Sequence, residues 1–124
     1  MIVKELKALR TTYPQCQILA LADISSGIVL CVSADEKPPQ EKLDAYCTLA
    51  TRMLASPAAV AATDDLGLGS PSVATANTAE QSVIFVRSKA EPGEALLCSA
   101  SHDLDTDRFV MAAQSSLEKI SNEQ

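Results

Sequence analysis

The stretch ILALADISSGIVLCVS, residues 18–33, decides the fold expected of this chain. Two runs rich in Ile, Leu and Val, residues 16–23 and 27–33, flank the short polar link ISSG. Such runs are typical of strands, and Gly27 supplies the positive φ angle that a tight hairpin turn needs. Because both runs are apolar at nearly every position, they predict a central hairpin covered on both faces, with Cys31 as a buried apolar residue.

A helix is expected on either side of this hairpin. The first covers residues 2–12, where apolar residues recur at helical spacing, and Pro14 ends it. The second helix is longer: Pro39 suits its first turn, and the apolar spacing continues to Ser56. Its apolar stripe contains Leu43, Tyr46, Cys47, Ala50, Met53 and Leu54.

The opposite face of the long helix leaves two alternatives open. Its small side chains, where a solvated face usually carries charges, are Ala45, Thr48, Thr51 and Ala55. Small residues would let another backbone approach closely, which favours a second buried face, but they are equally well tolerated on a helix surface. Pro57 then interrupts the pattern, so the helix either kinks or is followed by a short helix through residue 62, capped by Ser56.

Three further strands and a closing helix are expected in the second half. Residues 72–78 alternate weakly between apolar and polar, residues 81–89 form a clear strand, and residues 95–101 form another. The order is therefore helix, two strands, helix, three strands, helix. Runs of adjacent strands separated by a helix predict an α+β fold, a central antiparallel five-stranded sheet with helices packed on it, in one domain over residues 1–124.

Composition narrows the choice of partners. The formal net charge of −6 argues against binding to nucleic-acid phosphates, and there is no Trp to stack on bases. Residues 1–62 hold six basic and six acidic side chains, whereas residues 63–124 hold four and ten. A basic partner surface could use this asymmetry, although solubility explains it equally well. No run approaches membrane-spanning length and no signal region opens the chain, so we expect a cytoplasmic protein with no nucleic-acid partner and no membrane insertion.

The cysteines do not point to a metal. Cys16, Cys31, Cys47 and Cys98 stand far apart, no CxxC pair occurs, and His102 is the one histidine. A structural zinc site normally has at least one close ligand pair. In a reducing compartment these cysteines should behave as small buried hydrophobes. We therefore expect no metal and no cofactor.

Two other stretches look superficially like functional motifs. GLGSPS, residues 67–72, lacks the Lys and the flanking elements of a phosphate loop, so its glycines are interpreted as loop residues. SHDLDTD, residues 101–107, spaces its aspartates as calcium loops do, but no glycine turn or bidentate Glu follows. Asp103 or Asp105 is instead expected to cap the last helix. Because there is also no GxSxG elbow and no cysteine in surroundings that favour a thiolate, we do not expect an enzyme.

The hairpin, followed by PPQEKLDAYCTLATRML at residues 38–54, resembles the roadblock/dynein light chain family. In that family a helix precedes an apolar hairpin whose turn glycine is followed by a hydrophobic triplet. Here Gly27 precedes the triplet Ile28, Val29 and Leu30. The resemblance extends over nearly the whole chain and implies a roadblock/profilin-like architecture. The sequence departs from the family pattern in having YPQC in place of the glycine before the first strand, and in a less hydrophobic third strand.

The resemblance implies binding rather than catalysis. Domains of this family look like homodimers or heterodimers that pair through the long helix and the third strand, and they serve as adaptors on dynein motors or as partners of small Ras-like GTPases. We therefore expect a non-catalytic dimeric adaptor whose partners are a second copy and a GTPase or motor complex. The alternative is a small-molecule sensor of the profilin-like or PAS type. The residues expected at the dimer or partner interface are Leu43, Tyr46, Cys47, Ala50, Thr51, Leu54, Val73 and Thr75.

Overall fold

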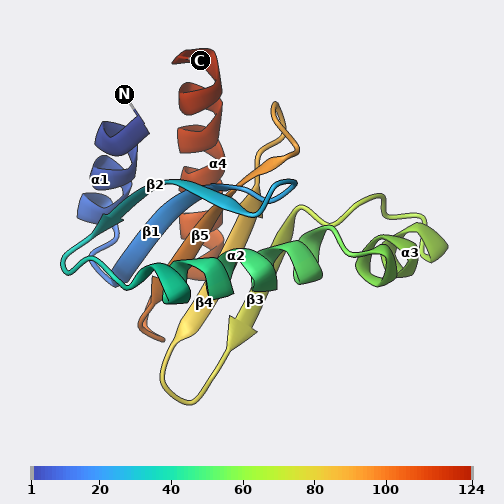
Figure 1. Cartoon of the computed structure of the whole chain (residues 1–124), viewed down its shortest axis with the longest axis horizontal. Coiled ribbons are helices and arrows are strands. Elements are labelled where there is room, and N and C mark those ends of the chain that lie inside the picture. Colours follow the sequence, from blue (N-terminus) through green and yellow to red (C-terminus); the bar gives the residue numbers. More distant parts are fainter. Residues whose placement is uncertain (1, 124) are drawn as a thin grey trace.

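The computed structural model describes residues 2–123. The predicted element order is confirmed, and it includes the separate short helix that was one of the two alternatives between the long helix and the third strand (Figure 1). In chain order the elements are α1 (Ile2–Thr12), β1 (Cys16–Asp23), β2 (Ile28–Ala34), α2 (Gln40–Leu54), α3 (Pro57–Asp65), β3 (Val73–Asn77), β4 (Ser82–Arg87), β5 (Glu94–Ala100) and α4 (Thr106–Glu123).

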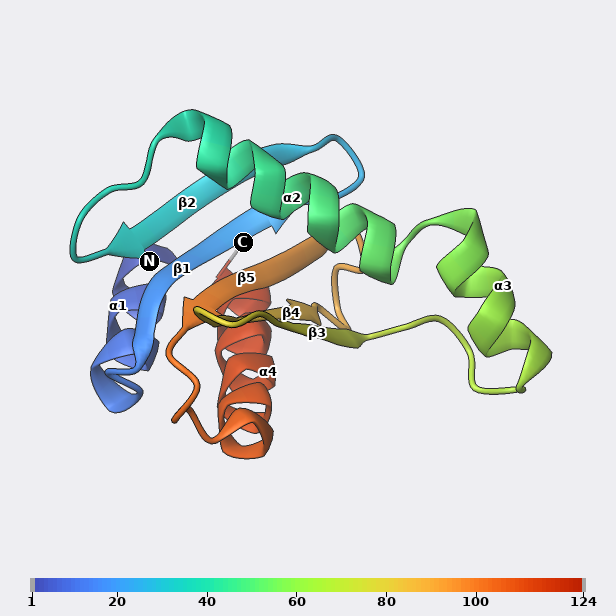
Figure 2. The ribbon, with the colours of Figure 1, turned by 90° about the horizontal axis from the view of Figure 1, so that it is seen from below.

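The five strands form one antiparallel sheet in the order β2-β1-β5-β4-β3. Helices α1 and α4 lie on one face of this sheet and α2 lies on the other, as Figure 2 shows. Helix α3 projects away from the body in both views and buries none of its residues. The predicted α+β class, with a central antiparallel five-stranded sheet, is therefore confirmed.

The face under α1 and α4 is closed by large side chains. Leu6 and Leu9 of α1 and Phe109 of α4 are buried against the sheet. The ring of Tyr13 meets the Phe109 ring edge to face, with 5.6 Å between the centroids, a geometry that adds to the gain from burial. Tyr13 Oη also donates a hydrogen bond to Arg108 O at 3.2 Å. These contacts hold the end of α1 against the start of α4.

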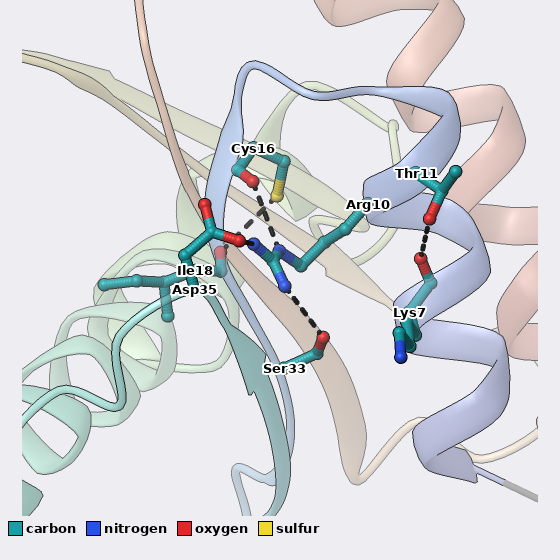
Figure 3. A network of polar contacts seen from close by, with 7 residues as sticks. All are labelled: Lys7, Arg10, Thr11, Cys16, Ile18, Ser33 and Asp35. Atoms are coloured by element: carbon teal, nitrogen blue, oxygen red, sulfur yellow. Dashed lines mark hydrogen bonds and ion pairs between the residues drawn. The ribbon is translucent and has the colours of Figure 1, made fainter.

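Arg10 fastens α1 to the first two strands (Figure 3). Its Nε donates to Cys16 O of β1 at 3.3 Å, and its Nη1 donates to Ser33 Oγ of β2 at 3.1 Å. Its Nη2 pairs with Asp35 at 2.6 Å, but the Asp35 side chain is 92 % exposed, so water screens this ion pair. The Arg10 side chain is only 13 % exposed, and its bonds to β1 and β2 therefore contribute more than the ion pair.

Helix α2 covers the other face by itself. Arg87 of β4 holds its C-terminal end, because Arg87 Nη2 donates to Leu54 O at 2.7 Å, one of the carbonyls that the end of a helix leaves free. The core beneath it is arranged around Phe85 of β4. The residues of α2 that are buried against the sheet are Leu43, Cys47, Ala50 and Leu54.

The prediction of a central hairpin is wrong for its second strand. β1 lies between β2 and β5 and is buried on both faces, but among the described residues β2 pairs with β1 alone and forms an edge of the sheet. The register shifts between Leu21 and Ala22, which leaves Leu30 of β2 as a bulge without a cross-strand partner. Ile28 is 56 % and Leu30 is 49 % exposed. Cys31 is half-buried, not buried as predicted, because the edge strand has a neighbour on one side only.

The turns and caps follow the sequence with small differences. Gly27 takes a φ of +78° between β1 and β2, as expected. Pro39 has non-helical angles, φ −59° and ψ 151°, so it precedes α2 as its N-cap and does not lie in the first turn. Of the two alternatives at Pro57, the separate helix is confirmed: Ser56 Oγ accepts from Ala59 N at 3.2 Å. That helix, α3, extends to Asp65, beyond its predicted end.

Candidate functional site

One long side of α2 carries apolar side chains that the sheet only half covers. Tyr46, Leu49 and Met53 are three and four residues apart, so they lie on the same side of the helix. All three are half-buried, and they pack against the same core as Ala74 of β3. We call Tyr46, Leu49 and Met53 the α2 flank. The α2 flank is thus an apolar row at the border of a core that stays partly in contact with water.

Polar contacts show which way the two sides of α2 face. On the flank side, Gln81, which directly precedes β4, donates its Nε2 to Tyr46 Oη at 3.2 Å. On the other side, Thr51 Oγ1 lies 3.2 Å from Ile24 O, in the turn between β1 and β2. The α2 flank therefore faces β3 and β4, whereas Thr51 faces the β1–β2 turn.

Strand β3 forms the edge of the sheet on the same side as the α2 flank, and within residues 2–123 it pairs only with β4. At the two ends of this segment, Ser72 O accepts from Arg87 N of β4 at 2.7 Å, and Thr78 N donates to Gln81 O, directly before β4, at 2.8 Å. Because hydrogen bonding alternates along an antiparallel strand, every second residue between them has its N–H and C=O on the open side. These residues are Val73, Thr75 and Asn77.

The eight residues expected at the interface do not lie together. Tyr46 lies at the border between α2 and β3 and packs against the same core as Ala74. Val73 of β3 packs against the other core, under α1 and α4, and Thr75 is exposed. Thr51 lies on the far side of α2. The other four contribute to the chain's own core, each with at most 2 % of its surface exposed, and offer a partner almost no surface: Leu43, Cys47, Ala50 and Leu54.

Two residues of this border were absent from the predicted interface. Met53 had been placed in the apolar stripe of α2 without an interface role. Leu49 lies off that stripe, on a side where a solvated helix would carry a polar residue. The apolar residue Leu49, which lies outside the inner stripe of α2, was the sequence signal that could have identified the α2 flank.

The other motifs do not assemble into a reactive site. Gly67 and Gly69 take φ angles of +71° and +76° in the exposed loop after α3. Asp105 is the predicted cap that is confirmed, because its Oδ1 accepts from Arg108 N at 3.2 Å. In the described part of the chain, no group of three or more His, Cys, Asp or Glu is placed to hold a metal ion. Among residues 2–123, none of the helices combines the length and apolar content needed to cross a bilayer.

Two of the thiols are held in the protonated form. Burial raises the pKa of the Cys31 thiol. Burial also raises the pKa of the Cys47 thiol, and the nearby carboxylates of Asp44 and Asp23 add to the effect. Because the thiolate is the nucleophilic form, neither cysteine is activated for attack.

Comparison with known proteins finds similarity in structure alone. No family model and no curated protein matches the sequence. The Roadblock/LC7 domain from Streptomyces avermitilis superposes with a TM-score of 0.80 at 14 % identity, covering 98 % of this chain and 95 % of that one. MglB from Myxococcus xanthus gives 0.78 at 13 % identity, covering 99 % and 96 %. The gliding protein MglB from Thermus thermophilus gives 0.76 at 19 % identity, covering 99 % and 90 %.

These superpositions extend over nearly the full length of both chains. The resemblance predicted from the hairpin and the long helix is thus confirmed: this chain has the fold of a Roadblock/LC7 domain.

Proposed function

We propose that this chain is a non-catalytic adaptor domain that works as a dimer, paired through α2 and β3. One observation carries the proposal: the half-covered α2 flank and the open edge of β3 occur together at the same border of the molecule. An apolar row supplies the hydrophobic driving force for association, and an unpaired strand edge supplies directional hydrogen bonds.

The simplest pairing is between two identical surfaces related by a two-fold axis. The outward backbone groups of Val73, Thr75 and Asn77 would pair with the same groups of a second copy, which extends the sheet across both subunits. Leu49 and Met53 would then meet their counterparts above the joined sheet. Each half-buried side chain that loses its remaining contact with water contributes about 1 kcal/mol.

The interface that we propose therefore differs in part from the set expected from the sequence. Tyr46, Val73 and Thr75 stay in it, and Leu49 and Met53 are added. Thr51 and the four buried residues of α2 would support this surface from behind, since they pack α2 against the sheet.

The further partner is proposed on the roadblock resemblance. Domains of that family serve as adaptors on dynein motors or as partners of small Ras-like GTPases, and we propose the same class of partner here, in the cytoplasm. The acidic half of the chain, residues 63–124, would suit a basic patch on such a partner. Binding to candidate GTPases loaded with GTP or with GDP tests this part of the proposal.

The dimer is tested by sedimentation equilibrium on three proteins: the wild type, Leu49→Glu and Thr48→Glu. The wild type is expected to be a dimer at tens of micromolar. Leu49→Glu places a charge on the α2 flank and should weaken dimerisation by roughly thirtyfold, about 2 kcal/mol. Thr48→Glu places the same charge on the exposed outer side of α2 and should leave the dimer unchanged.

Two results would contradict the proposed dimer. A wild-type protein that is strictly monomeric at these concentrations would remove it. If Leu49→Glu and Thr48→Glu weakened association equally, the interface would lie elsewhere.

A surface groove is the observation that favours the alternative, a small-molecule sensor. A groove of about 580 Å³ lies between the end of β4 and α4, with Lys89, Met111 and Glu118 in its lining, and its size falls within the range of ligand pockets. It lies outside the core, and Met111 is 72 % exposed. Native mass spectrometry separates the two functions: a bound small molecule lost on denaturation would favour the sensor, and a ligand-free dimer the adaptor.

A further inference from the structure

Two cysteines far apart in the sequence bring their sulfur atoms into contact inside the core. Cys16 Sγ and Cys98 Sγ are 2.9 Å apart, and both thiols are free. Cys16 begins β1 and Cys98 lies in the middle of β5, and they are 1 % and 2 % exposed. Both belong to the core under α1 and α4, so the contact is on the opposite face from the proposed dimer surface.

The strand register explains why the two side chains meet. Cys16 lies opposite Ala100, and Cys98 is two residues from Ala100, so the two cysteines point to the same face of the sheet. A register irregularity between Cys16 and Ile18 lets the first residue of β1 lean along the partner strand. Arg10 holds this end of β1, because its Nε donates to Cys16 O (Figure 3).

Little movement separates this contact from a covalent bond. A disulfide has an S–S length of about 2.05 Å, so the sulfurs must approach by about 0.9 Å, which side-chain rotation can supply. The other two cysteines are not placed for such a bond with this pair. Cys47 lies under α2 on the other face, and Cys31 pairs with Leu21, well along β1 from Cys16.

We propose that Cys16 and Cys98 form an oxidation site, at which a peroxide converts two thiols into one reversible disulfide between β1 and β5. In the first step, one thiolate attacks a peroxide oxygen of H₂O₂ and becomes a sulfenic acid, while hydroxide leaves and takes up a proton to give water. In the second step, the other thiol attacks that sulfur, the S–S bond forms and a second water leaves. Two electrons and two protons pass from the dithiol to H₂O₂, which is reduced to two waters.

The two sulfurs have different roles in this sequence. The pKa of the Cys98 thiol is raised well above its usual value, first by its hydrogen bond to Cys16 and then by burial, so Cys98 keeps its proton. Cys16 is the first residue of β1 and directly follows the turn at Pro14 and Gln15, and the ends of a strand generally open more readily than its centre, where Cys98 lies in β5. Cys16 is therefore the attacking sulfur and Cys98 the resolving one.

The test uses the full chain, fully reduced and then treated with H₂O₂. Intact-mass analysis of the unlabelled protein should show a loss of about 2 Da. When a second sample is unfolded in N-ethylmaleimide, two of its four cysteines should be labelled. Proteolysis should yield a Cys16–Cys98 linked pair that dithiothreitol separates. Because the bond ties residues distant in sequence, the oxidised protein should melt about 10 °C higher, and reduction should reverse the shift.

Matched variants assign the bond. The double variant Cys31→Ala/Cys47→Ala should still lose about 2 Da on oxidation. Cys98→Ala should not, and its Cys16 should remain available to the label or appear as a sulfenic acid. A wild-type protein in which Cys16 and Cys98 remain separate thiols, are over-oxidised, or pair with Cys31 or Cys47 would overturn the proposal. Since this result is read on the wild type, it does not depend on how any variant folds or on whether the protein dimerises.

Discussion

Two helices, α1 and α4, lie across one face of the sheet, whereas α2 alone lies across the other (Figure 2). The first face is closed by the chain itself, with Phe109, Leu6 and Ile120 almost without contact with water. Around α2, apolar side chains of the helix and the neighbouring strands stay half-exposed: Val29, Val32, Tyr46, Leu49, Met53 and Ala74. The first core also has half-buried apolar neighbours: Ile2, Tyr13, Cys31, Val73, Val110 and Ala112. The second face therefore differs in its cover, one helix in place of two, and in having its half-buried row on α2 beside the open edge of β3.

If the closed face carries most of the stability, truncating its largest side chain should have the largest effect of all. Phe109→Ala removes a fully buried ring and its contact with Tyr13, and it should lower the free energy of unfolding by about 3–5 kcal/mol. Urea denaturation measures this loss, which should be the same at every protein concentration. A loss below about 1 kcal/mol would show that this layer is not the closed one.

The open border predicts an effect that depends on concentration. Thr75→Pro removes a backbone N–H on the outer side of β3 and leaves the bonds to β4 in place, so it should weaken dimerisation by at least tenfold, about 1.4 kcal/mol. Sedimentation velocity at several concentrations measures the change. The control is Thr75→Val, which keeps the N–H and should dimerise as the wild type does. Equal weakening by both variants would assign the effect to the side chain.

Arg10 tests how α1 is held on the closed face. Arg10→Met keeps the apolar stem and loses the hydrogen bonds to Cys16 O and Ser33 Oγ, so we expect about 1–2 kcal/mol of lost stability in thermal or urea unfolding. Asp35→Asn is the matched control. Because the Asp35 side chain is 92 % exposed, breaking its ion pair should cost less than about 0.5 kcal/mol. If Asp35→Asn lost more stability than Arg10→Met, the ion pair would contribute more than the hydrogen bonds of Arg10 to Cys16 O and Ser33 Oγ.

The smallest effect is expected in the β1–β2 turn, at the Thr51 side of α2. Asp23 Oδ1 accepts from Ser25 Oγ, from Ser26 N at 3.2 Å and from Ser25 N at 3.0 Å, and these bonds hold the pKa of Asp23 below its usual 3.8. A lowered pKa stabilises the folded chain above pH 3.8, and that contribution is lost as the pH falls through the lowered value.

Asp23→Asn should therefore melt slightly below the wild type at neutral pH. The gap between the two melting temperatures should close as the pH falls below 3.8. Thermal unfolding of both proteins over a pH series measures it. A gap that stays constant with pH would show that the charge of Asp23 contributes nothing.

Local chemistry made much of the fold predictable. Gly27 marks a turn that needs a positive φ, Ser56 and Pro57 mark the start of a helix, and Asp105 marks another. In each case the signal lies within a few residues of the feature it controls.

The order of the strands in the sheet is not determined by such neighbouring residues. The run IVLCVSA is as apolar as a central strand, yet β2 lies at an edge, because sheet order depends on which strands pair across the whole chain.

The candidate site was less predictable for the same reason. Helical spacing identifies the inner stripe of α2, and it correctly separates Leu43 and Leu54 from the polar positions. It does not say which side of the helix the sheet leaves uncovered. Leu49 and Thr51 both flank that stripe, and only the position of α2 between the β1–β2 turn and β3 distinguishes them. Likewise, the meeting of Cys16 and Cys98 follows from the pairing of β1 with β5, which no sequence spacing reveals.

The bulge at Leu30 has a consequence for the size of any assembly. A flat sheet with two free edges can add molecules at both ends and grow into a filament. In this chain the β2 edge has a bulge at Leu30, and because a bulge bends its strand and increases the local twist, this edge is a poor template for a straight incoming strand. In the proposed dimer, the regular edge at β3 would be occupied by the same edge of the second copy. If the chain pairs in this way, addition of further strands would end at the dimer, because the edges left free are the bulged ones at β2.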